Sequence, residues 1–297
     1  MSSSQLEKGN RFAALHRRQG AFIIPNPWDA GTARVLTALG FEALTTTSAG
    51  LAFALGRKDG AGMISRAETL ANAKAIADAT DLPVAADLEN GFGDAPEAAA
   101  ETIRLAGEFA GLVGGSIEDA TGDPRRPIYD FEHAVERIAA AVEAARALGT
   151  PFVLVARAEN FLHDRPDLDD TIRRLQAFQA AGADALYAPG LTRAEDIRTL
   201  CQSVSRPVNV LMEVEDSEHR SLTVPELAAL GVRRISLGSS LSRAAYGALV
   251  RAAREVKELG TRTFAMEAVS YASLNAAMVG PTPDEGHEAA PEREPAT

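Results

Sequence analysis

The fold is indicated most clearly by residues 83–118, PVAADLENGFGDAPEAAAETIRLAGEFAGLVGGSIE. The apolar segment Pro83–Glu89 is followed by the Ala-rich helical pattern Pro96–Ala110 and then by a second apolar segment, Leu112–Glu118. Short apolar runs bounded by glycine or proline are typical of buried strands. A strand, a helix and a second strand in this order predict a parallel βα unit.

The same alternation extends over most of the chain. Short apolar segments occur eight times, at Phe22–Pro25, Glu42–Ser48, Pro83–Glu89, Leu112–Glu118, Phe152–Arg157, Asp184–Pro189, Pro207–Met212 and Val232–Gly238. Helical patterns lie between or after them, at Asp29–Leu39, Arg66–Ala79, Pro96–Ala110, Glu132–Leu148, Leu168–Ala181, Ala194–Ser203, Val224–Leu230 and Ala244–Leu259. Eight such units predict an α/β protein with a (β/α)8 TIM barrel. A doubly wound open sheet would alternate similarly, but no glycine-rich dinucleotide fingerprint follows the first segment.

The domain organisation follows from this pattern. A chain of 297 residues could hold two domains of ~150 residues each. A TIM barrel, however, uses ~250 residues as one domain. We therefore expect one barrel domain over residues 1–279, with an N-terminal helix and a further apolar helix, Phe264–Met278, beyond the barrel. Residues 280–297 are rich in Pro, Glu and Ala and are expected to form a disordered acidic tail.

Charge and cysteine content restrict the partners. The 41 acidic and 30 basic residues give a net charge of −11, which argues against nucleic acid and an anionic membrane surface as partners. Cys201 is the single cysteine, so no intrachain disulfide can form. The first residues show no signal-peptide pattern, and no apolar run reaches the ~18 residues of a membrane span. We expect a cytoplasmic protein that acts on a small molecule.

Charged side chains follow the predicted strands at the barrel end that carries active sites. Asp87 and Glu89 end the third apolar segment, Glu118 ends the fourth and Arg157 ends the fifth. Residues two positions apart on a strand point the same way, so Asp87 and Glu89 are expected to face one point. Three carboxylates suit a hard ion such as Mg²⁺, and an arginine suits a substrate carboxylate. The alternative is that one or more of these carboxylates simply pairs with Arg157.

Six motifs carry a resemblance to a known family. They are PNPWDAGTA at residues 25–33, TSAGL at 47–51, LGRKD at 55–59, DLENGFG at 87–93, IED at 117–119 and VAR at 155–157. In this order they resemble the isocitrate lyase/phosphoenolpyruvate mutase superfamily, over roughly Phe12 to Met278. The similarity includes its carboxyvinyl-carboxyphosphonate phosphorylmutase-like and oxaloacetate decarboxylase-like branch.

The resemblance implies a TIM barrel that uses Mg²⁺, or alternatively Mn²⁺, to act on 2-oxo acids. It implies metal-holding roles, several of them through water, for Asp59, Asp87, Glu89 and Glu118. It also implies a homotetramer, a dimer of dimers, in which the extra C-terminal helix Phe264–Met278 is exchanged between subunits.

The substrate and catalytic residues are carried over in the same way. The loop Thr47, Ser48 and Ala49 matches the loop that contacts the substrate carboxylate, and Arg157 matches the arginine that stabilises the enolate oxygen. Substrate binding is therefore expected at Thr47, Ser48, Ala49, Arg157, Asn209 and, at the barrel mouth, Trp28. Catalysis is expected from Arg157, Ser48 and Glu118. For Trp28, a packing role is an equal alternative.

The loop 120–129 departs from the lyases of this family, because it contains no Cys, Lys or His that could act as the general acid. The leading hypothesis is a Mg²⁺-dependent carbon–carbon lyase or decarboxylase, which acts on a small 2-oxo or 2-hydroxy dicarboxylic acid through an enolate. In it, the loop is a lid and Arg125 or Arg126 reaches a distal anionic group. One alternative is a phosphonate P–C bond enzyme, similar to phosphoenolpyruvate mutase or phosphonopyruvate hydrolase. Another is a catalytically silent barrel that binds an oxo acid.

Overall fold

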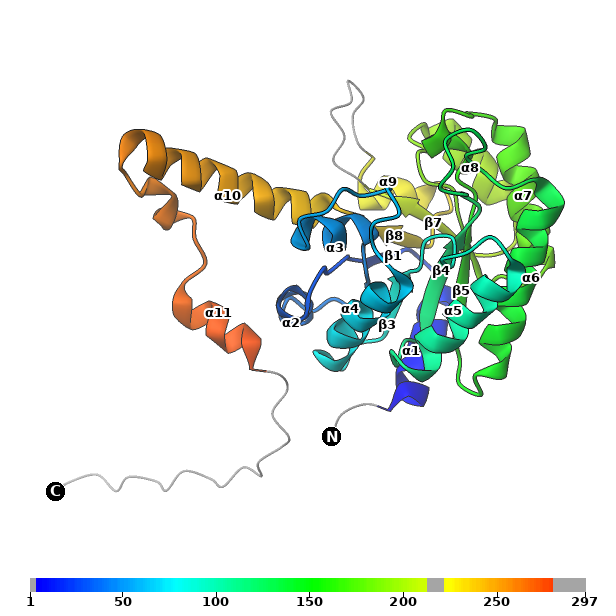
Figure 1. Ribbon diagram of the computed structural model, residues 1–297, viewed down its shortest axis with the longest axis horizontal. Helices are drawn as coiled ribbons and strands as arrows, with labels where there is room; N and C mark the ends of the chain where they lie inside the picture. Colours follow the sequence, from blue (N-terminus) through cyan, green and yellow to red (C-terminus); the bar gives the residue numbers. More distant parts are fainter. Residues whose placement is uncertain (1–3, 213–221, 280–297) are drawn as a thin grey trace.

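The computed structural model describes residues 4–212 and 222–279. Eight parallel strands form one sheet in the order β1-β8-β7-β6-β5-β4-β3-β2 (Figure 1). The strands are β1 Phe22–Ile24, β2 Leu44–Thr45, β3 Val84–Asp87, β4 Gly114–Glu118, β5 Val153–Arg157, β6 Ala185–Tyr187, β7 Val208–Leu211 and β8 Arg234–Ser236. The backbone N–H of Thr45 donates to the Pro25 carbonyl at 3.1 Å, which joins β2 to the end of β1. The predicted (β/α)8 TIM barrel is confirmed.

Helices surround the barrel and extend beyond it. They are α1 Gln5–Arg17, α2 Ala30–Ala38, α3 Ser48–Ala54, α4 Arg66–Asp78, α5 Pro96–Glu108, α6 Phe131–Ala147, α7 Leu168–Ala180, α8 Ala194–Ser203, α9 Val224–Ala229, α10 Ser240–Leu259 and α11 Tyr271–Met278, with 3-10 helices η1 Asn160–His163 and η2 Thr263–Met266. The sequence pattern missed α3 and η1, which are short. The expected tail, 280–297, lies outside the described residues, so the domain boundary at residue 279 stays a prediction.

The prediction of one helix over Phe264–Met278 is wrong, because η2 and α11 are separate. Ser270 has extended backbone and its hydroxyl accepts from the Ser273 N–H at 3.1 Å, which starts a new helix at Tyr271. A serine side chain that caps a helix competes with continuation of the preceding turn. The apolar pattern indicates helical backbone, and the Ser270 cap divides that backbone into two helices.

Side-chain alternation gives the barrel interior two zones. Near the amino ends of the strands, Phe22, Ile24, Ala85 and Val153 form an apolar cluster with Phe12 of α1. Alternate residues nearer the carboxyl ends are polar or charged and face a cavity. Neighbouring positions on each strand face outward and pack under the helices in the main core. The apolar zone thus supports the polar zone, which holds the candidate site.

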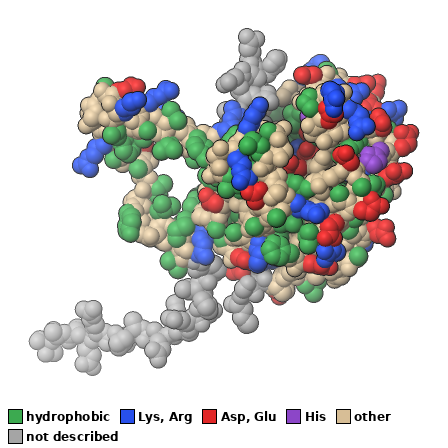
Figure 2. All heavy atoms as spheres, in the orientation of Figure 1, with side chains coloured by type: hydrophobic (Ala, Val, Ile, Leu, Met, Phe, Trp, Pro, Cys, Tyr) green, Lys and Arg blue, Asp and Glu red, His purple; other side chains and the backbone are tan. Residues whose placement is uncertain are grey.

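The helices α10 and α11 form an arm beside the barrel (Figure 1). Apolar side chains remain exposed along it, as Figure 2 shows in green, including Leu249, Leu259, Met266 and Tyr271. At the far end, Arg34 of α2 donates to the carbonyl of Met278. Exchange of this arm between subunits stays a prediction. In the described part of the chain, no helix is long and apolar enough to cross a membrane.

Candidate active site

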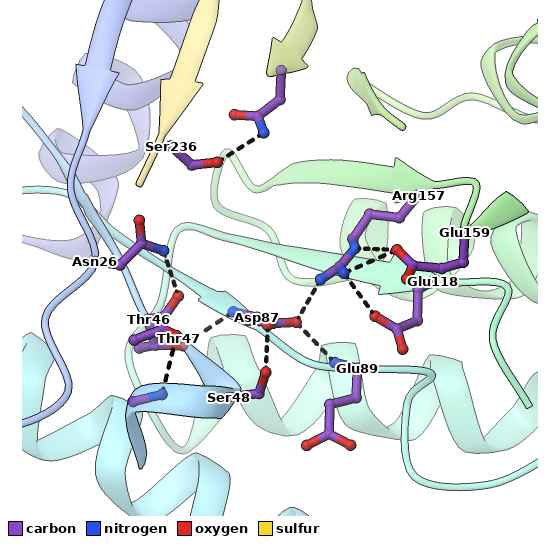
Figure 3. A network of polar contacts seen from close by, with 12 residues as sticks. Asn26, Thr46, Thr47, Ser48, Asp87, Glu89, Glu118, Arg157, Glu159 and Ser236 are labelled. Atoms are coloured by element: carbon purple, nitrogen blue, oxygen red, sulfur yellow. Dashed lines mark hydrogen bonds and ion pairs between the residues drawn. The ribbon is translucent and has the colours of Figure 1, made fainter. Parts of the chain in front are cut away.

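Arg157, at the end of β5, is the centre of the charged cluster (Figure 3). Its Nη1 lies 2.9 Å from Asp87 Oδ1, and its Nη2 lies 3.2 Å from Glu118 Oε2 and 2.9 Å from Glu159 Oε1. The side chain is 12% exposed and its guanidinium carbon stands 5.1 Å from the centre of the Tyr187 ring. Arg157 therefore forms ion pairs with three carboxylates, which lie on β3, on β4 and just after β5. Asp87 and Glu118 thus form the ion pairs with Arg157 that the sequence left open.

Asp87 is held from the opposite side by the loop that follows β2. Ser48 Oγ donates to Asp87 Oδ2 at 2.9 Å, and the Asp87 N–H donates to Thr46 Oγ1 at 3.0 Å. Thr47 caps α3, because its Oγ1 accepts from the Gly50 N–H at 3.2 Å. A side chain at Gly50 would place its Cβ 2.5 Å from Thr47 and 3.0 Å from Trp28, so the tight start of α3 requires glycine. These bonds fix Ser48 beside Asp87.

The carboxylates of the cluster have unusual acidities. Burial raises the pKa of Glu118 well above its usual value; Arg157 opposes the rise, and Glu159 adds to it. Burial also raises the pKa of Glu89 to about 7, assisted by the negative charges of Asp87 and Asp59. Burial lowers the pKa of Arg157, but Glu159, Glu118 and Asp87 outweigh that effect and raise it well above its usual value. Shifts of this kind, where several like charges share a buried site, are typical of functional centres.

The turn after β3 corrects the expectation that Asp87 and Glu89 face one point. The strand ends at Asp87, and Glu89 adopts a left-handed backbone with φ 48°. The Glu89 side chain consequently points away from Arg157 in Figure 3. Phe92 is also left-handed at φ 61°, and Gly91 lies so close to α5 that a Cβ would approach Ala99 Cα to 2.8 Å. Strained residues in a tight turn are often associated with function.

A cavity of about 170 Å³ opens above these residues at the carboxyl ends of the strands. Its lining includes the predicted residues Thr47, Ser48, Ala49, Asp59, Asp87, Arg157 and Asn209. The lining does not include Glu89, Glu118 or Trp28. Glu118 lies beside it, bound to Arg157, whereas Trp28 packs behind Gly50 with its carbonyl accepting from Asn72. For Trp28 this geometry favours the packing alternative.

Other lining residues were not singled out from the sequence. They include Asn26, Tyr187, Arg234 and Ser236. Asn26 Nδ2 donates to the Thr46 carbonyl at 2.9 Å, and Asn209 Nδ2 donates to Ser236 Oγ at 3.0 Å. Arg234 and Ser236 are two positions apart on β8, so alternation could have identified them as a polar pair facing the interior. Glu159, whose side chain is 4% exposed, lies two residues after the VAR motif and was not among the residues predicted from the sequence.

The cluster suits a divalent cation by its chemistry. Asp59, Asp87, Glu89 and Glu118 offer only oxygen donors, as Mg²⁺ and Mn²⁺ prefer. Within the described residues, the Glu89 carboxylate has no hydrogen bond or ion pair, although Asp87 and Asp59 are near enough to raise its pKa. A cation would relieve that repulsion. Among residues 4–212 and 222–279, no three acidic, His or Cys side chains converge to hold an ion directly. Mg²⁺ usually keeps several waters, so an ion at this cluster would be held partly through water.

Comparison with known proteins gives the family. The family model described as phosphoenolpyruvate phosphomutase matches residues 12–257. The solved structure of a Burkholderia cenocepacia protein, described as a lyase/mutase, is 56% identical, with coverage of 93% of this chain and 97% of that chain and a TM-score of 0.89. A 2-methylisocitrate lyase of Halalkalibacterium halodurans is 28% identical over 89% of this chain and 87% of its own length.

The solved structure of a 2,3-dimethylmalate lyase is 28% identical, with coverage of 92% of this chain and 95% of that chain and a TM-score of 0.81. The two lyases are named for small carboxylic acids, and the match spans nearly the whole barrel in each. The chain belongs to the phosphoenolpyruvate phosphomutase family, within the isocitrate lyase/phosphoenolpyruvate mutase superfamily.

Proposed function

We propose that the protein is a Mg²⁺-dependent lyase or decarboxylase that breaks a carbon–carbon bond in a small 2-oxo or 2-hydroxy dicarboxylic acid. The observation that carries the proposal is the placement of Arg157 between Asp87, Glu118 and Glu159 at the edge of a small polar cavity. The cavity volume of about 170 Å³ lies below the ~300–1,000 Å³ of sites for drug-sized ligands. A compact acid fits that volume.

Binding and orientation are assigned to the β2 loop and to Arg157. Ser48 and Ala49 line the cavity from one side and Arg157 from the other. A substrate placed between them presents its 2-oxo group to the guanidinium. When the bond beyond the carbonyl breaks, the electron pair moves onto the carbonyl oxygen as an enolate. A buried cation that is already in place stabilises that charge at little reorganisation cost.

The metal would be held by Asp87, Glu89, Glu118 and Asp59 through direct and water-mediated contacts, and it would supply Lewis-acid polarisation of the substrate carbonyl. Ser48 has a positioning role, because its hydroxyl holds the Asp87 carboxylate. Tyr187 packs on the Arg157 guanidinium and keeps it aligned. The protein's own residues thus orient the substrate and provide a fixed positive charge, with the Tyr187 ring beside it.

The chemistry of loop 120–129 favours a leaving group that needs no proton. That loop has no Cys, Lys or His, and its Arg125 is paired with Asp123 at 3.0 Å. Carbon dioxide departs without a proton donor, and solvent water can then protonate the enolate carbon to give the 2-oxo acid product. A leaving carboxylate-stabilised carbanion, in contrast, requires a positioned proton donor. Decarboxylation of a 2-oxo dicarboxylic acid is therefore the preferred reaction, ahead of cleavage to two acids.

A turnover assay tests the proposal. Purified protein with Mg²⁺ is given oxaloacetate, 2-methylisocitrate and 2,3-dimethylmalate in separate reactions, and products are compared with a Mg²⁺-only blank. We expect pyruvate from oxaloacetate above the blank, with loss of that activity in Arg157→Met and on chelation. No turnover of any of the three acids above the blank contradicts the proposal. Turnover of phosphonopyruvate alone, followed by phosphorus NMR, would instead support the P–C bond alternative.

A further inference from the structure

A second buried arginine, Arg234 on β8, faces the same cavity as Arg157. It is 4% exposed, and within the described part of the chain its Nε has no hydrogen-bond partner. Among residues 4–212 and 222–279, its guanidinium makes neither a hydrogen bond nor an ion pair. Arg157, in contrast, is matched by three carboxylates. Burying a cation without a counterion costs folding free energy, and groups buried in this way are candidates for ligand binding.

The register of the sheet places the two arginines in one row. Arg157 is paired with Tyr187, Tyr187 with Asn209, and Asn209 with Arg234, across β5, β6, β7 and β8. Register partners in a parallel sheet point to the same face, which here is the barrel interior. All four side chains line the cavity. A ligand in the cavity would therefore face two arginines. Arg157 is paired with carboxylates, whereas Arg234 forms no ion pair with the described residues.

On the side of β1 and α1, the described residues next to Arg234 carry no negative charge. Phe22 of β1 is its register partner, and His16 of α1 lies between the rings of Phe12 and Phe22. Burial lowers the pKa of His16 to about 3, with a further contribution from Arg234, so the imidazole is neutral at pH 7. Burial lowers the pKa of Arg234 to about 10, which still leaves the guanidinium charged. Asp87 is near enough to favour the charged form of Arg234, but no described carboxylate forms an ion pair with it, so a ligand anion in the cavity can take that place.

We propose that Arg234 binds the second carboxylate of the dicarboxylic acid whose 2-oxo or 2-hydroxy end faces Arg157. The inference rests on the proposed function only in its choice of a dicarboxylic acid. An arginine fork binds a carboxylate through two parallel hydrogen bonds, and the neighbouring Asn209 on β7 also lines the cavity. This proposal reassigns to Arg234 the distal-group role expected of Arg125 or Arg126, because both are exposed and Arg125 is paired with Asp123.

The test compares two ligands that differ by one carboxylate, malate and lactate, by titration calorimetry with Mg²⁺ present. Wild type is expected to bind malate about tenfold or more tightly than lactate. Arg234→Met is expected to lose that preference by weakening malate binding while leaving lactate binding within about twofold. Arg234→Gln serves as a second variant of similar polarity, with the same expected loss. Arg234→Lys keeps the charge without the fork and should show an intermediate loss.

Arg233 provides a matched control, because it is the preceding residue and points to the opposite side of the strand, near Cys201 of α8. Arg233→Met should leave both affinities unchanged. Removing an unpaired buried charge should also keep or raise the melting temperature in Arg234→Met, whereas a purely structural arginine would lower it.

The outcomes separate this inference from the proposed function. Equal weakening of malate and lactate in Arg234→Met, unchanged malate binding in that variant, or no preference for malate in wild type overturns the role of Arg234. None of these results depends on turnover. A protein that prefers malate through Arg234 but converts no substrate keeps the binding role and loses the proposed reaction.

Discussion

Arg157 on β5 and Asp87 on β3 are joined across the intervening strand β4 by an ion pair of 2.9 Å between Nη1 and Oδ1. The other oxygen of Asp87 accepts from Ser48. A single carboxylate thus connects the arginine expected to stabilise the enolate with the loop expected to bind the substrate. Changes at any of the three positions should therefore affect both binding and catalysis.

Arg157→Met should remove activity and also destabilise the fold. Without the guanidinium, Asp87, Glu118 and Glu159 face one another in a buried site. We expect the free energy of unfolding to fall by about 3–5 kcal/mol at pH 8. The loss should be smaller at pH 5, because protonation of Glu118, whose pKa is raised in the folded state, relieves part of the repulsion. Urea denaturation at both pH values measures the difference.

The control for this variant is Arg104→Met. Arg104 is also shared by two carboxylates, Glu101 and Glu108, but all three side chains are exposed on α5. Exposed pairs contribute little to stability because water screens them. Similar destabilisation by both variants would show that burial does not increase the contribution of Arg157 to the free energy of unfolding.

Ser48→Ala should reduce activity by about 10- to 100-fold, which is the range expected for loss of a hydrogen bond to a charged group. The missing hydroxyl leaves Asp87 Oδ2 without its donor, so Asp87 can rotate away from the cavity. Steady-state kinetics with oxaloacetate measure the effect, and the melting temperature should change little. Ser203→Ala, on the surface helix α8, is the control. Unaltered kinetics in Ser48→Ala would remove Ser48 from the mechanism.

Glu89 should make magnesium binding depend on pH. Its pKa of about 7 means that the carboxyl group is largely protonated below neutral pH, when it cannot bind a cation. The apparent affinity for Mg²⁺ should therefore rise as the pH increases through about 7, with release of a proton on binding. Glu89→Gln should flatten this profile and weaken the affinity at high pH. Calorimetry in two buffers of different ionisation enthalpy detects the proton.

The same group should influence the stability of the metal-free protein. Because its pKa is higher in the folded state than the usual value of 4.5, its stabilising effect is present below about 4.5 and is lost as the pH rises through about 7. Glu89→Gln should lack that slope, whereas Glu143→Gln on α6 should retain it. An unchanged slope in Glu89→Gln would mean that another group titrates in this window.

The exposed arm predicts self-association. Leu249 on α10 is 61% exposed, and apolar side chains continue along the arm through α11. Large exposed apolar patches mark interfaces. We expect the 31.3 kDa chain to sediment as a tetramer and Leu249→Lys to shift it toward smaller species. Lys257→Ala, which changes a charge on the same helix, should leave the mass unchanged. A monomeric wild type at micromolar concentration would refute the assembly.

Local sequence was sufficient for the barrel. Each of the eight apolar segments contains a strand, since short β-branched or Ala-rich runs bounded by Gly and Pro have few other ways to bury their side chains. The boundaries of α4 and α8 were also readable, because Ser65 caps α4 and apolar periodicity marks α8. The apolar pattern did not predict the division between η2 and α11, because that division depends on a single capping residue, Ser270.

The candidate site was predictable only in part. By itself, the sequence determined that Asp87, Glu118 and Arg157 end adjacent strands, because the order of parallel strands follows the order of the chain. Only the tertiary structure decided which carboxylates Arg157 contacts, because ion pairing depends on side-chain distances across strands. The tertiary structure also directs the Glu89 side chain away from Arg157, because Glu89 itself has a left-handed backbone. It places Arg234 beside Phe22 and near neutral His16. Charge compensation is a property of three-dimensional neighbours, and those neighbours are far apart in the chain.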